Sequence, residues 1–165
     1  MAATSATNKI DENASSDSAY LSAPKSKPSF NRIDSSLLLA FSGMPQLVQP
    51  DYSRDRKPRI FEIRTYESFS EPKAAKKIDM FNAGEIDAMK EVGMAPIFYG
   101  QALIGSNLPH LTYMLSAEDM DAHRAHWAAF MNHPKWKELQ RDRQYADTVS
   151  KITNWFVVPT SYSQI

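Results

Sequence analysis

The feature that most limits the fold is the order of strand and helix patterns between Arg59 and Ile165. The stretch IFEIRTYE alternates in side-chain character with the period of a β-strand. A helix is predicted from Ser70 to Gly93, because Ser and Pro suit its first turn, apolar residues recur at helical spacing, and glycine suits its end. The segment therefore begins as a strand followed by a helix.

Two further strands are predicted at Ile97–Gly105 and Leu111–Leu115, joined by the hairpin turn SNLPH. Ser116 followed by Asp119 resembles a capping box that begins a second helix, which an Asn-His-Pro sequence interrupts. A last strand is predicted at Ile152–Val158. The order β-α-β-β-α-β predicts an α+β, ferredoxin-like sandwich, in which two helices cover one face of a four-stranded antiparallel sheet.

The face of this sheet away from the helices needs a second explanation. On it we place the polar residues Glu62, Arg64, Tyr66, Tyr99, Gln101 and Asn154 among the apolar residues Ile97, Leu103, Ile152 and Phe156. Such a surface is too apolar for free solvent and too polar for a simple core. We therefore expect two copies to join these faces, as a homodimeric α+β barrel with a polar-lined interior.

The residues before this segment differ in composition. Residues 1–35 are rich in Ser, Ala, Asn, Asp, Lys and Pro, which predicts a disordered tail. Residues 36–58 contain the apolar stretch SLLLAFSGMPQLV, which predicts a strand, and then a charged linker. This strand could add to an edge of the domain at residues 59–165, pair with another chain, or be the remnant of a preceding domain.

Composition excludes several classes of protein. The chain has 19 basic and 19 acidic residues, which gives no basic stripe for nucleic acid, and no Cys for thiolate chemistry or metal ligation. Its apolar runs fall far short of the roughly 20 residues that span a bilayer. We identify no targeting signal, so we expect a cytoplasmic location, with mitochondrial association left open.

One trio on the first strand suggests chemistry. Arg64 could hold a carboxylate or an enolate-like oxyanion, Glu62 could orient Arg64 or act as a base, and Tyr66 could donate a hydrogen bond. The alternative, which we weight more heavily, is that the three residues satisfy one another as a structural network.

The histidines and aromatic residues of the second helix allow further interpretations. His123 and His126 lie three residues apart, with His123 close to an apolar stripe, but the nearby acidic residues suit helix capping better than ligation. We predict no metal and no cofactor. Trp127 and its aromatic neighbours more often pack a helix onto its sheet than form a ligand cage.

Several stretches together resemble the NIPSNAP domain, a dimeric α+β-barrel domain: FEIRTYE, GMAPIFYGQALIG, PHLTYML, HWAAFMNHPKWKEL and ITNWFVVPTSYSQI. The resemblance covers residues 59–165, and its most telling parts are Glu62-x-Arg64-x-Tyr66 and Trp127–Trp136. It implies a ferredoxin-like protomer and a homodimer. It also implies that SLLLAFSGMPQL is similar to the last strand of a preceding copy of the domain.

Two functions follow as hypotheses. The first is a homodimeric domain that binds a small, partly apolar ligand or a protein partner. The second, which the wider superfamily suggests, is a cofactor-independent monooxygenase acting on a small aromatic or enolisable substrate. Its substrate would lie between the sheet and the helices, with Arg64, Tyr66, Tyr99 and His123 as the polar groups. The sequence leaves open whether the protein is an enzyme.

Overall fold

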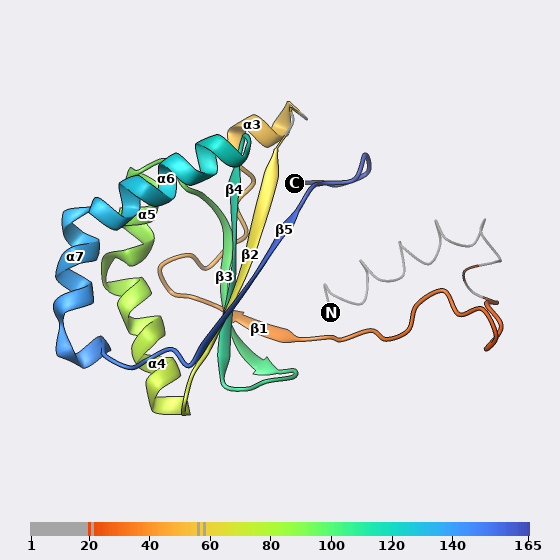
Figure 1. Ribbon diagram of the computed structural model, residues 1–165, viewed down its shortest axis with the longest axis horizontal. Helices are drawn as coiled ribbons and strands as arrows, with labels where there is room; N and C mark the ends of the chain where they lie inside the picture. Colours follow the sequence, from red (N-terminus) through yellow and green to blue (C-terminus); the bar gives the residue numbers. More distant parts are fainter. Residues whose placement is uncertain (1–19, 21, 56, 58) are drawn as a thin grey trace. The chain divides into compact units, whose positions relative to one another are not determined.

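A five-stranded antiparallel β-sheet forms the centre of the folded unit in the computed structural model (Figure 1). The structure describes residues 20, 22–55, 57 and 59–165. The strands lie in the order β1-β3-β4-β2-β5. Their bounds are Leu37–Ala40 (β1), Ile60–Glu67 (β2), Ala95–Ile104 (β3), His110–Ala117 (β4) and Lys151–Val157 (β5). Strands β2 to β5 have the ferredoxin-like order, which confirms the predicted fold class.

The helices occupy the two connections that the sequence predicts. Between β2 and β3 lie α4 (Glu71–Met80), a π-helical turn (Phe81–Glu85) and α5 (Ile86–Glu91). Between β4 and β5 lie α6 (Met120–Asn132), α7 (Pro134–Arg141) and a 3₁₀ turn (Arg143–Tyr145). A short helix, α3 (Asp51–Arg54), lies between β1 and β2. Figure 1 shows α4, α5, α6 and α7 on one side of the sheet, which leaves its other face without a helix from this group.

Local side-chain chemistry explains where two of these helices begin and bend. Asp119 is the N-cap of α6, since its carboxylate accepts hydrogen bonds from the backbone N–H of Asp121 (2.9 Å) and of Ala122 (2.8 Å). The predicted capping box led by Ser116 is wrong, because Ser116 lies within β4. The helix predicted from Ser70 to Gly93 is interrupted by the π-helical turn, where Gly84 has φ of 138°.

The apolar stretch before the domain adds a strand to the sheet. Only Leu37–Ala40 is extended, and it pairs with β3, with Leu38 opposite Ala102. Beyond it, Phe41 and Met44 pack into the main core between the sheet and the helices. Edge addition is therefore the arrangement that the structure shows for this segment.

Most of the residues that we placed on the helix-free face of the sheet lie on the helix side instead. The main core, which includes Tyr66, Tyr99 and Tyr113 of the sheet with Phe81 and Phe130 of the helical segments, lies on the helix side. The alternate residues of β2 face the other way, where Phe61 packs in a smaller cluster with Ile97 and Met114. By strand register, the Glu62 side also carries Gln101, Leu103, Asn154, Ile152 and Phe156.

The error has a physical cause. Both faces of β2 carry buried or half-buried side chains, so apolar character alone could not show which face the helices cover. Ile97 does lie on the helix-free side, as predicted, because the β3–β4 register shifts between Pro96 and Phe98, so that a bulge separates Ile97 from the side of Tyr99 and Gln101.

The residues up to Ser35 form a unit separate from Ser36–Ile165. In its described part, Ser29 donates a hydrogen bond to the main-chain oxygen of Tyr20 at 3.2 Å. Most of the predicted disordered tail, residues 1–19 and 21, lies outside the described residues. None of the helices in the described ranges has the length and apolar character needed to cross a membrane.

Candidate functional site

Glu62 is the centre of a buried polar cluster between the sheet and α6. Its side chain is 1% exposed. One carboxylate oxygen accepts hydrogen bonds from Arg64 Nη1 (2.7 Å) and Asn154 Nδ2 (3.2 Å). The other accepts from Trp127 Nε1 (3.0 Å) and lies 3.5 Å from His123 Nε2. Residues from β2, β5 and α6 therefore converge on one carboxylate.

Arg64 extends the cluster along β2. Its guanidinium carbon lies 4.6 Å from the centre of the Trp127 ring, and its Nε donates to the Tyr66 hydroxyl at 3.2 Å. The Tyr66 and Tyr113 hydroxyls are 2.8 Å apart. Burial works to lower the pKa of Arg64, but Tyr113, Tyr66 and Glu62 oppose it and hold that pKa above its ordinary value. Arg64 is thus a fixed cation.

His123 lies at the edge of this cluster. Its ring meets the rings of Trp127 and Phe156 edge-on, with centroids 6.3 Å and 5.1 Å away. Burial lowers the pKa of His123, the positive charge of Arg64 acts in the same direction, and Glu62 opposes both. The imidazole is therefore neutral at pH 7 and retains one nitrogen that can accept a proton.

A second buried ion pair lies beside the first cluster. Lys77 of α4 donates to Glu85 at 2.7 Å across the π-helical turn, and both side chains are at most 5% exposed. Lys77 Nζ also lies 4.7 Å from the centre of the Phe81 ring and 5.4 Å from that of Trp136. Burial raises the pKa of Glu85, and Lys77 partly opposes the shift.

Sequence reasoning did not select this pair, nor Tyr113. The available signal was the spacing of Lys77 and Glu85, eight residues apart on a helix that also carries Phe81 toward the core. For Tyr113, the signal was the alternation of PHLTYML along its strand.

Most of the predicted site residues lie close together in the structure, but on the helix side of the sheet rather than on the predicted helix-free side. Tyr99 lies one step away, where it stacks on Tyr113 with centroids 5.2 Å apart and donates to the sulfur of Met89. Gln101 lies farther along β3, opposite Leu111. The enzyme hypothesis placed Arg64, Tyr66, Tyr99 and His123 between sheet and helices, which is where they lie.

The arrangement limits the chemistry available. Glu62 and Arg64 are already bound to protein groups, so they form a closed network rather than an open set of ligand-binding groups. Phe156, whose ring contacts that of His123 at the edge of the cluster, is 47% exposed. No group of three or more His, Cys, Asp or Glu side chains within the described part of the chain could hold a metal ion.

The sheet order and the layer of helices define a ferredoxin-like α+β protein. Residues 61–164 match the family model NIPSNAP, so the chain belongs to the NIPSNAP family. No curated protein matches the chain.

Solved structures show the same fold. A NIPSNAP-like domain protein from Burkholderia xenovorans is 22% identical with a TM-score of 0.57, over 65% of this chain and 90% of that one. A NIPSNAP family protein with unknown function from Agrobacterium tumefaciens is 18% identical with a TM-score of 0.57, over 65% of this chain and 93% of the other. A second NIPSNAP family protein from A. tumefaciens is 16% identical with a TM-score of 0.58, over 65% and 98%.

Proposed function

We propose that the NIPSNAP domain of this chain is a homodimeric binding domain, in which two copies associate through the helix-free face of the sheet and β5. The observation that carries the proposal is the exposure of β5. Trp155 lies opposite Ile63 on the helix-free face and is 64% exposed, with Val157 two residues farther on the same side. Large apolar side chains grouped on a surface mark sites of association.

The backbone of β5 supports the same proposal. This seven-residue strand lies at the end of the sheet order, so one side of its backbone has no neighbouring strand among the residues that the structure describes. An edge strand of this length with apolar side chains on both faces readily pairs with another chain. A second copy is a suitable partner, because the same patch on both chains can be self-complementary about a two-fold axis.

Sedimentation velocity at micromolar concentration tests the dimer. We expect the wild-type chain to sediment as a dimer and Trp155→Ser to weaken association by about tenfold or more, since a central aromatic residue often dominates an interface. Phe69→Ser is the matched control, because Phe69 is 70% exposed in the turn after β2. A monomeric wild type, or equal effects of both substitutions, would contradict the proposal.

The polar cluster supports a second candidate function, a cofactor-independent monooxygenase. A neutral His123 can accept a proton from a phenol or an enolisable carbon, and the fixed charge of Arg64 can stabilise the resulting anion. The substrate would supply all the electrons, with one oxygen atom of O₂ entering the product and the other leaving as water. We rank this function second because the cluster is closed by its own hydrogen bonds.

Oxygen consumption with phenol and quinol substrates tests the second candidate. We expect activity to be lost in His123→Gln and retained in His126→Gln, which changes a histidine one helical turn away. Mass spectrometry of small molecules that copurify with the protein tests ligand binding independently. Oxygen uptake that both variants retain would rule out the role of His123.

A further inference from the structure

The residues that follow β5 fold back onto the helix-free face of the sheet. Ile165 packs against the buried cluster of Phe61, Ile97 and Met114 on that face. Figure 1 shows the chain returning from the end of β5 on the side of the sheet away from α4, α5, α6 and α7. Residues 158–165, which we call the cover segment, therefore occupy part of the face through which we propose that two copies associate.

Contacts at its far end hold the cover segment in place. Arg59 Nη2 donates a hydrogen bond to the main-chain oxygen of Ile165, and Gln49 Nε2 donates to that of Gln164 at 3.0 Å. The Ser163 hydroxyl also donates to the Ile165 oxygen at 2.9 Å, which fixes the conformation of this end. Together with the apolar contact of the Ile165 side chain, these bonds attach the segment to β2 and to the stretch before α3.

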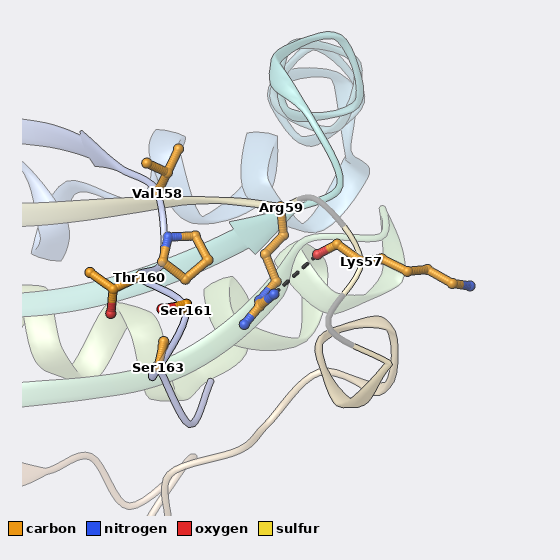
Figure 2. Close-up of a pocket in the computed structure, with 7 residues that line it drawn as sticks. Lys57, Arg59, Val158, Thr160, Ser161 and Ser163 are labelled. Carbon is orange, nitrogen blue, oxygen red and sulfur yellow. Dashed lines mark hydrogen bonds between the residues drawn. The ribbon is translucent and has the colours of Figure 1, made fainter.

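The remainder of the cover segment is held less tightly. A hollow of about 500 Å³ lies between it and the start of β2. Figure 2 shows Arg59 directed across this hollow toward the part of the segment that carries Ser161 and Ser163. Val158 and Tyr162 are 74% and 82% exposed. A segment anchored mainly at one end, with few buried apolar contacts, opens at a low cost in free energy.

We propose that the cover segment competes with the second copy for the helix-free face, so that each chain must release this segment before the two sheets can pack. The inference rests on the homodimer proposed above and describes its regulation. Two sheets that pack face to face lie about 10 Å apart, and their side chains fill the space between them. A further stretch of backbone does not fit in that layer, so the segment and a second copy exclude each other.

The two positions of the cover segment expose different parts of the face. Trp155 and Val157 are exposed while the segment is docked, so they can make the first contact with a second copy. The cluster around Phe61 becomes available only when Ile165 leaves it. Because both copies must open, the apparent dissociation constant of the dimer varies with the inverse square of the open fraction when that fraction is small.

Sedimentation velocity of the full chain over a series of concentrations tests the proposal. Ile165→Ser removes a partly buried aliphatic side chain, which should weaken docking of the segment about tenfold. We therefore expect this variant to tighten the dimer by between about tenfold and about a hundredfold. Gln49→Ala should act in the same direction by a smaller factor, because it removes one hydrogen bond between neutral groups.

Gln164→Ser is the matched control in the same segment. Gln49 binds the main-chain oxygen of this residue, which the substitution retains, so the dissociation constant should change by less than about twofold. A dimer that is unchanged or weaker in Ile165→Ser would overturn the inference. So would equal effects of Ile165→Ser and Gln164→Ser.

Hydrogen–deuterium exchange of the wild-type chain tests the same point without a substitution. As the concentration rises through dimerisation, the amides of β5 should exchange more slowly and those of residues 158–165 faster. Slower exchange in both segments would overturn the inference, because the cover segment would then stay docked in the dimer.

Trp155→Ser separates this inference from the proposed dimer. If Trp155→Ser weakens association and Ile165→Ser does not strengthen it, the dimer stands and the cover segment is not its competitor. If neither substitution changes association, both proposals fail.

Discussion

Replacement of Glu62 by Gln tests whether the buried cluster holds the fold together. The substitution keeps the shape of the side chain but removes the charge that balances Arg64, at 2.7 Å, where the two side chains are 1% and 16% exposed. An amide has one acceptor oxygen, whereas Glu62 uses both of its oxygens to accept bonds from Arg64, Asn154 and Trp127. In either orientation the amide N–H₂ therefore faces a donor.

The expected cost follows from these contacts. Removal of one partner from a buried ion pair costs roughly 3–5 kcal/mol. Because Arg64 retains some exposure, we expect the lower end, about 3 kcal/mol, with at least one lost hydrogen bond included. With a typical urea m-value of about 2 kcal/mol/M, the unfolding midpoint should fall by about 1.5 M.

Glu67→Gln is the matched control on the same strand. Glu67 lies 3.3 Å from Lys151, with side chains 23% and 64% exposed, so its loss should cost about 0.5 kcal/mol or less. Urea unfolding followed by tryptophan fluorescence measures both variants. A cost below about 1 kcal/mol for Glu62→Gln, or equal costs for the two variants, would refute the reasoning about burial.

Three further predictions follow from local structure. Asp119→Ala should destabilise the protein by about 1 kcal/mol in urea unfolding, because it removes the α6 cap, and Asp121→Ala should cost less. Gly84→Ala should destabilise it by about 1–3 kcal/mol in the same assay, since φ is 138° and the new Cβ would lie 2.7 Å from Lys135 Cε; an unchanged midpoint would contradict this geometry. Because the folded state lowers the pKa of His123 from its ordinary 6.5, the unfolded chain takes up this proton first, so stability is lost as pH falls below that value. The loss between about pH 7.5 and about pH 5 should be smaller in His123→Gln, and an identical loss in both proteins would show that His123 does not titrate as inferred.

The sequence was sufficient to predict the order of the elements. Three local signals served for this: the alternation in IFEIRTYE, the glycine at position 93 and the turn SNLPH. Each reflects a local requirement of the backbone, so the strands and helix ends could be placed within a few residues. These signals do not depend on which neighbours a side chain meets.

The sidedness of the sheet could not be predicted in the same way. Glu62, Arg64 and Tyr66 are polar, so we placed them away from the helices, yet Trp127 and Tyr113 supply partners that make their burial tolerable. Trp127 lies 65 residues from its partner Glu62 in the chain, and Tyr113 lies 47 residues from its partner Tyr66. A polar residue becomes a core residue through such long-range contacts, which a local pattern does not contain.

The short first strand has a consequence for how copies of this chain can assemble. β1 covers the β3 edge with only four residues and an irregular register, whereas β5 leaves seven residues along the opposite edge. A chain with two long, bare edges could add copies at both ends and grow into a fibre. Because β1 leaves only a short, irregular ladder at one end, growth by edge pairing is blunted there, and the proposed association through β5 would therefore stop at two chains.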